Sequence, residues 1–199
     1  MDPWGHMPTK LPAPKMTQAI AWKFCEACNW AYEAWVMHKY LFDLNPDPTA
    51  TIERRNVIPF FNRLSNITHE YALQQIAKLH DPAVMGKDHN LSIEFVVCFG
   101  EWGNKENDIK AIRNRLSEFW GHVSPARNKL LAHNDLETIL ADKSLGGFPV
   151  GEDDQYFLEL QNLVNAVSER WLGCQIYPFN DLAIRDVEDF LDEIRANRN

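Results

Sequence analysis

The residues best suited to chemistry lie in the stretch Ser124–His133. Arg127 carries a permanent charge and five N–H donors, so its guanidinium can bind a phosphate in bidentate fashion. His133 has an imidazole that titrates near neutral pH and can therefore move a proton. Asn128 adds a polar amide directly after the arginine. Phosphate binding and proton transfer are the two tasks that a ribonuclease working without a metal must perform.

The spacing of Arg127 and His133 also has a geometric meaning. Ser124-Pro125 is typical of a helix start, because serine caps the first turn and proline fits its first position. Six helical positions separate two side chains by about 120° and about 9 Å along the axis. The two residues would therefore flank a groove, and a two-fold related copy would add a second pair to it. We expect His133 to act as a base on the ribose 2′-hydroxyl, while Arg127 and the positive helix end stabilise the phosphate.

A structural interpretation of the same residues remains open. Arg127 can form an ion pair with Asp135 or Glu137, and His133 can be a packed histidine. Lys129 can contact a phosphate or simply be solvated, and Asn128 can orient a neighbouring side chain or the substrate.

Charge is distributed unevenly along the chain. The 199 residues carry a net charge of −8, which argues against binding nucleic acid over the whole surface. Residues 108–133 nevertheless hold five basic residues against two acidic ones, whereas residues 151–199 hold eleven acidic against four basic. We therefore include Arg113 and Arg115 with Lys129 as candidate substrate-binding residues. An ordinary solvated helix face is the alternative.

Composition favours one domain of a cytoplasmic protein. Hydrophobic residues make up 45% of the chain, as in globular proteins, and no apolar run reaches the ~20 residues of a membrane span. The N-terminus has no apolar segment typical of a secretory signal. Cys25 and Cys28 form a C-x-x-C pair, but a second pair is absent and both lie in a helical apolar pattern. We expect them to be core residues, and we expect neither a metal site nor a cofactor.

Apolar residues recur every three or four positions through most of the chain, which predicts an all-α bundle of five or more helices. Residues 1–16 are expected to form a flexible tail, and residues 17–199 a single helical domain. Helices are expected at about 17–44, 47–79 with a kink or break at Pro59, 91–99, 108–123, 124–140, 153–171 and 181–194. In the second helix we expect one apolar stripe to face the core. Its residues are Ile52, Phe60, Leu64, Ile67, Tyr71, Ile76 and Leu79.

The motif resembles that of the HEPN superfamily, in which an arginine is followed by a polar residue and, after four to six positions, by a histidine. Here it is Arg127-Asn128-x-x-x-Ala132-His133. The trailing Asn134-Asp135 and the helix ending in His80-Asp81 are similar to the abortive-infection, AbiU-like branch. The resemblance covers about residues 17–175, although only the motif is specific.

The resemblance implies a homodimer or pseudo-dimer in which two motifs meet, and RNA cleavage without a metal in many members. It implies Arg127, Asn128 and His133 as catalytic residues of a toxin or antiviral defence ribonuclease. An antitoxin or regulatory protein would be a further partner. HEPN sites also draw a polar residue from another helix, for which Glu70, Asp81 and Asn90 are candidates. Two alternatives remain: a non-catalytic HEPN module that binds a nucleotide, nucleic acid or protein, and an unrelated bundle with an acidic interaction surface.

Overall fold

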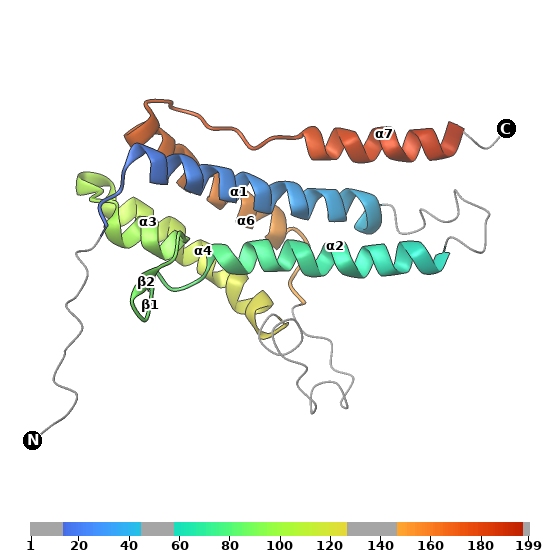
Figure 1. Ribbon diagram of the computed structural model, residues 1–199, viewed down its shortest axis with the longest axis horizontal. Coiled ribbons are helices and arrows are strands. Elements are labelled where there is room, and N and C mark those ends of the chain that lie inside the picture. Colours follow the sequence, from blue (N-terminus) through green and yellow to red (C-terminus); the bar gives the residue numbers. More distant parts are fainter. Residues whose placement is uncertain (1–13, 45–57, 127–146, 197–199) are drawn as a thin grey trace, which may run out of the picture.

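The computed structural model describes residues 14–44, 58–126 and 147–196. This part of the chain contains six α-helices and one small hairpin, so the expected all-α bundle is confirmed (Figure 1). The helices are α1 (Gln18–His38), α2 (Ile58–Leu79), α3 (Ile93–Phe99), α4 (Glu106–Ala126), α6 (Glu152–Val167) and α7 (Leu182–Ala196). Short π-helical turns, Lys39–Asp43 and Ser168–Leu172, extend α1 and α6, and a 3₁₀ turn, Gly103–Lys105, precedes α4. Strands β1 (Val84–Met85) and β2 (Asp88–His89) pair antiparallel.

Helix α1 is the central element of the bundle. Its start is fixed by Thr17, whose hydroxyl accepts a hydrogen bond from the backbone N–H of Ile20. The predicted apolar stripe is buried along most of its length, with Phe24, Cys28 and Trp35 in the core. Figure 1 shows α1 between α7 and the antiparallel α2, and α1 contacts both helices.

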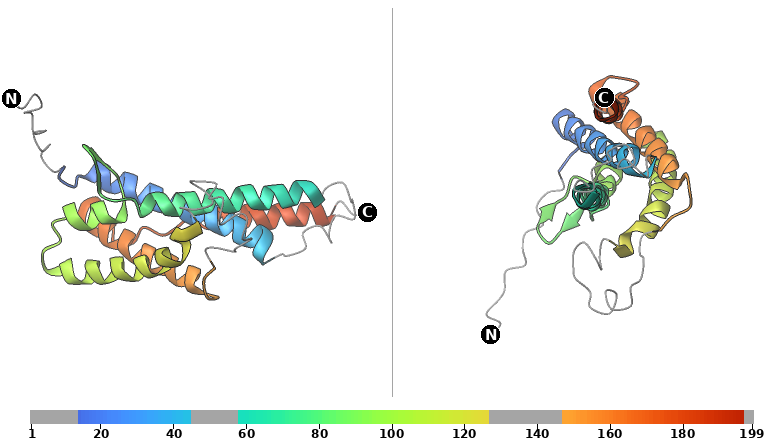
Figure 2. Two further views of the ribbon diagram at one scale, coloured as in Figure 1. Left: turned by 90° about the horizontal axis from the view of Figure 1, so that it is seen from below. Right: turned by 90° about the vertical axis from the view of Figure 1, so that its right-hand side faces the viewer.

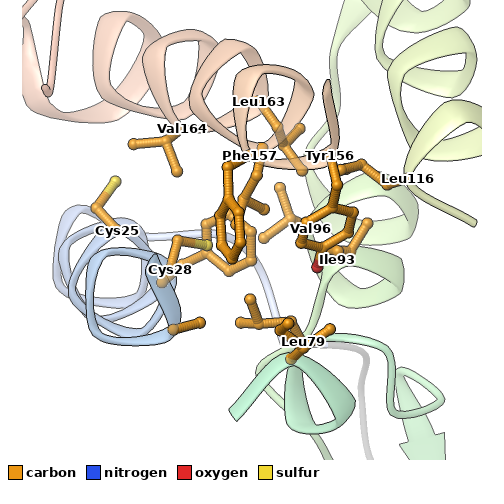
Figure 3. Packing of buried hydrophobic residues seen from close by; sticks show 14 of the residues in the cluster. Cys25, Cys28, Leu79, Ile93, Val96, Leu116, Tyr156, Phe157, Leu163 and Val164 are labelled. Atoms are coloured by element: carbon orange, nitrogen blue, oxygen red, sulfur yellow. The ribbon is translucent and has the colours of Figure 1, made fainter. Parts of the chain in front are cut away.

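The main core lies where α1, α2, α3, α4 and α6 meet (Figure 3). Cys25 and Cys28 are fully buried there, as predicted for core residues. Burial raises the pKa of the Cys25 thiol to about 12, so it stays protonated at neutral pH. Ser92 caps α3 by accepting from the N–H of Phe95, and this confirms the helix expected at 91–99.

Two helix boundaries differ from the sequence prediction. Helix α4 begins at Glu106 rather than Asp108, and Ser124-Pro125 lies inside its last described turns instead of starting a new helix. Proline has no N–H, so α4 lacks the hydrogen bond that residue 125 would otherwise donate to the carbonyl of Gly121. Helix α6 is preceded by Gly151 in a left-handed conformation, φ 89°, and Asp153 is a buried residue of its first turn rather than its cap.

The orientation of α2 differs from the prediction as well. Its buried face contains Phe61, Ala72 and Ile76, whereas Phe60, Ile67 and Tyr71 are exposed. The predicted stripe is therefore confirmed at Ile76 and Leu79, near the end of α2, and wrong at Phe60, Ile67 and Tyr71. The hairpin after α2 was not predicted either. It is closed by Gly86, whose φ of 64° suits a residue without a side chain.

Several expectations fall at the edges of the described chain. Met16, which was assigned to the tail, packs against the core, and residues 1–13 are outside the described part. The residues before Ile58 are outside it as well, so the expected kink at Pro59 is not tested. None of the described helices is both long and apolar enough to cross a membrane.

Candidate functional site

The Arg127–His133 motif itself lies outside the described residues, together with Asn128 and Lys129. The structure does describe the element that leads into it. Helix α4 ends, as described, at Ala126, which is 5% exposed and follows the buried residues Leu116, Phe119 and Val123.

The chain returns to the core close to the same place. Phe148, just after the undescribed segment, lies 4.9 Å from Phe119 and 5.9 Å from Trp35 between ring centroids. Phe119 in turn lies 4.7 Å from Tyr156 of α6. One aromatic cluster thus holds both ends of the segment that contains the motif, and α4 and α6 are the scaffold of the candidate site (Figure 2).

The two candidate substrate-binding arginines on α4 point to different neighbours. Arg115 binds Glu159 of α6 in bidentate fashion, with Nε–Oε1 2.8 Å and Nη2–Oε2 2.9 Å. Arg113 pairs with Glu94 of α3 at 3.3 Å. Since two helical positions correspond to about 200°, the two guanidinium groups lie on opposite sides of α4. RNA phosphates would have to compete with a carboxylate for either arginine.

The α4–α6 interface carries further charged groups near the motif end. His122 of α4 lies 3.4 Å from Glu152 of α6, and a cavity of about 200 Å³ lies between Arg115, Glu118 and Glu152. The Arg115 hydrogen bond lowers the pKa of the Glu159 carboxyl below its usual value and outweighs the opposing effect of burial. Glu159 therefore stays ionised and keeps Arg115 in place at neutral pH.

A buried ion pair holds the start of α6 against α1. Asp153 accepts hydrogen bonds from Lys39 Nζ at 2.7 Å and from the Trp35 indole N–H at 3.0 Å. Lys39 also donates to the exposed Asp154 at 2.6 Å. Burial raises the pKa of Asp153, but the hydrogen bonds from Lys39 and Trp35 outweigh it and lower the pKa overall. Sequence reasoning missed this network because its partners are 114 residues apart.

Beside this network lies a cavity of about 1000 Å³ between α1, α6 and the segment before α7. Its lining includes Asp43, Asp153, Asp154 and Asp181, with Lys39 as the basic residue among them. A surface with this balance repels phosphate.

Two histidines pack against other rings, and His38 is buried whereas His80 is half-buried. His80 stacks on Trp120 at 5.0 Å, and its Nε2 lies 3.0 Å from the Tyr156 hydroxyl. Burial lowers the pKa of His80 to about 3. His38 is buried and stacks on His69 at 4.9 Å. Within the described ranges, no group of three or more His, Cys, Asp or Glu side chains is arranged to hold a metal ion.

The candidates for an extra polar site residue are scattered. Glu70 is exposed on α2, and Asp81 follows α2 directly after His80. The amide of Asn90 donates to the carbonyl of Pro82 at 2.8 Å and so closes the hairpin. Trp102 is buried and donates to the Val96 carbonyl, which leaves it unable to stack on a base.

Comparison with known proteins gives a match to part of this chain. Residues 103–192 match the family model HEPN_AbiU2, described as AbiU2. The matched part is slightly less than half of the chain and contains α4, the motif, α6 and most of α7. The resemblance to the AbiU-like branch of the HEPN superfamily is thereby confirmed. Neither the curated proteins nor the solved structures contain a match to the chain.

Proposed function

Because residues 103–192 match the AbiU2 branch of the HEPN superfamily, we propose that the chain is a metal-independent endoribonuclease of the defence or toxin type. Its catalytic residues are Arg127, Asn128 and His133. The observation that carries the proposal is the complete Arg-Asn-x-x-x-Ala-His motif inside the matched region, next to the end of α4.

The proposed reaction is a transesterification within the RNA. His133 removes the proton of a ribose 2′-hydroxyl, and the oxygen attacks the adjacent phosphorus. Arg127 stabilises the negative charge that gathers on the phosphate oxygens. The bond from phosphorus to the 5′ oxygen breaks, and this oxygen takes up a proton. In a homodimer, His133 of the partner subunit can supply that proton, which is why the site needs two copies.

One part of the expected chemistry changes with the structure. The positive end of a helix beginning at Pro125 was expected to assist Arg127, but Pro125 lies in the last described turn of α4. Charge stabilisation in the proposed site therefore rests on the guanidinium of Arg127 rather than on a helix start.

Binding of RNA is proposed to use Lys129, Arg113 and Arg115 as phosphate contacts. The acidic cavity beside Asp153 supports an approach along α4, because it disfavours phosphate on the other side of α6. A phosphate could take the place of Glu94 as the partner of Arg113, or of Glu159 as the partner of Arg115. Each arginine would then exchange one anionic partner for another.

The alternative is a HEPN module that binds a nucleotide, a nucleic acid or a regulatory protein without cleaving it. The ion pairs of Arg113 and Arg115 favour this alternative, because both side chains already have structural partners. In that case Arg127 would contribute to binding of the ligand, and no RNA product would form.

The test is incubation of the purified protein with single-stranded RNA, and with DNA of the same sequence, in excess EDTA. The proposal predicts RNA products ending in a 2′,3′-cyclic phosphate, detected by mass spectrometry, and intact DNA, because DNA lacks the nucleophilic hydroxyl. RNA binding without any product supports the binding module. Cleavage that stops in EDTA contradicts the proposed mechanism.

A further inference from the structure

An apolar groove lies open between α2 and α7. These two helices flank α1 on either side, and α1 forms the floor between them (Figure 1). The groove has a volume of about 410 Å³, which is within the range of pockets that bind ligands or side-chain anchors. Along α1 its lining extends from Trp30 to Leu41 in the turn that follows the helix. These residues span about 16 Å, or three helical turns.

The walls of the groove are fixed by contacts within the chain. The indole N–H of Trp30 donates a hydrogen bond to the Tyr71 hydroxyl at 2.7 Å, which joins α1 to α2 at one end. At the other end Leu64 of α2 packs against the buried Leu41 and Val187. The groove is therefore formed before a partner arrives, and binding does not have to open it.

Three large side chains of the groove nevertheless remain open to solvent. Trp30 is 52% exposed, Phe190 43% and Met37 36%. Aromatic residues and methionine are enriched in protein interfaces, and tryptophan often contributes a large share of the binding energy there. Exposed apolar side chains gathered in one groove therefore indicate a surface that binds another molecule.

The charged groups of the groove are all acidic. Its lining contains the carboxylates of Glu33 and Asp186, and no lysine, arginine or histidine. Glu33 accepts a hydrogen bond from the Asn29 amide at 2.8 Å, whereas Asp186 forms no ion pair with any residue that the structure describes. The exposed Asp189 lies one turn further along α7 and continues the acidic edge. The groove therefore favours a partner that carries positive charge beside its apolar groups.

From this combination we propose that the groove binds a basic, amphipathic helix of another protein. Apolar side chains of that helix pack on Trp30, Met37 and Phe190, as in other complexes in which a helix lies in an apolar groove. Lysine or arginine residues on the flank that faces α7 pair with Asp186 and Asp189. The floor of the groove is long enough for about three turns of the bound helix.

The same carboxylates decide against other classes of occupant. They repel the phosphate groups of RNA and of an anionic membrane surface. A second copy of the chain, whose net charge is −8, is less complementary to the groove than a basic protein. Binding of a basic helix does not depend on RNA cleavage, so either proposal can fail while the other stands.

The test is fluorescence anisotropy of the full chain with labelled peptides of about 14 residues, long enough to span the groove. The probe is a helical peptide with leucines on one face and lysines on the other, and it should bind in the micromolar range. A peptide with glutamate in place of every lysine should bind about tenfold or more weakly. A scrambled leucine–lysine peptide, with the same charge but no apolar face, should not bind.

Variants of the chain place the binding in the groove. Met37→Lys puts a cation beside the apolar anchors and should weaken binding of the lysine peptide about tenfold or more. Met85→Lys makes the same exchange on the exposed hairpin and should bind like the wild type. Asp186→Lys should weaken the lysine peptide and strengthen the glutamate peptide. Asp88→Lys, its matched control in the hairpin, should do neither.

Melting curves followed by circular dichroism accompany each variant. Met37 and Asp186 are exposed, so neither variant should lower the melting temperature. If Met37→Lys melts earlier, the comparison of Asp186→Lys with its control decides alone. The proposal is overturned if the wild type does not bind the lysine peptide, or if the glutamate or scrambled peptide binds as tightly. Wild-type affinity for the lysine peptide in Asp186→Lys also overturns it.

Discussion

Asp153 connects two helices through a single carboxylate. It accepts hydrogen bonds from Lys39 and Trp35 of the first helical segment, although it is itself in the first turn of α6. Asp154 is the next residue and binds the same lysine, but its side chain is 74% exposed. The two neighbours therefore differ in burial while sharing a partner, and they form a natural pair for comparison.

We expect Asp153→Ala to lower the free energy of unfolding by about 2–4 kcal/mol, because it leaves a buried indole N–H unsatisfied and removes a buried charge partner. Asp154→Ala should cost about 0–1 kcal/mol, as exposed ion pairs do. Urea unfolding of the two variants and the wild type measures the difference. Equal losses in both variants would contradict the assigned role of Asp153.

The protonation of His80 provides a second test at the level of one residue. Its folded pKa of about 3 is below the ordinary value of 6.5, so the unfolded chain binds more protons between these two values. The stabilisation from neutral His80 is therefore complete above pH 6.5 and is lost as the pH falls towards 3. His80 alone should contribute a slope of about 1.4 kcal/mol per pH unit.

Urea unfolding between pH 7 and pH 4.5 should isolate this slope by comparing the wild type with His80→Phe. Phenylalanine can still stack on Trp120 but cannot take up a proton. The variant should lose less stability than the wild type over this range, although His38, with a pKa lowered by burial to about 4, contributes in both. Identical pH dependences would contradict the burial of a neutral His80.

Helix α4 is the element that decides how the site meets a phosphate chain. It carries Arg113 towards α3 and Arg115 towards α6, and ends in the buried Ala126 beside the motif. If both arginines contact RNA, the strand must pass over the helix rather than along one side of it.

Replacing either Arg113 or Arg115 by glutamine should reduce the salt dependence of RNA binding. This dependence is the slope of the logarithm of the binding constant against the logarithm of the salt concentration. Each lost phosphate contact should lower the magnitude of this slope by about 0.7 for single-stranded RNA. Lys105→Gln makes the same charge change at the other end of α4, where Lys105 pairs with Glu169, and should leave the slope unchanged. Fluorescence anisotropy at several salt concentrations measures these slopes. An unaltered slope in Arg113→Gln and Arg115→Gln would restrict both residues to structural roles.

The elements also show what the sequence could and could not predict. Periodicity located α1 and α7 well, because capping residues and apolar spacing are local. It identified an apolar face on α2 but could not say whether Phe60 and Ile67 face the core or another molecule. The hairpin at Val84–His89 escaped prediction because its strands have two residues each. The Lys39–Asp153 pair depends on packing between distant segments, which spacing does not reveal.

At the scale of the whole molecule, the account requires two copies of the chain. The proposed site combines two motifs, one from each copy. The acidic segment after residue 151 keeps most of the surface unfavourable for nucleic acid, so binding would concentrate near α4.

Cleavage should therefore depend on protein concentration. Specific activity on RNA should fall on dilution, in parallel with the dimer fraction measured by light scattering, because monomers hold half a site. A specific activity that stays constant while the protein dissociates into monomers would show that one copy is sufficient.

The central claim is that His133 transfers a proton in a metal-free site. The most direct measurement is the rate of RNA cleavage in EDTA by His133→Ala and by His122→Ala, an exposed histidine on α4 that serves as the matched control. The account predicts a loss of about 10²–10⁴-fold for His133→Ala, with unchanged helical circular dichroism, and a rate near that of the wild type for His122→Ala. A wild-type rate in His133→Ala would contradict it.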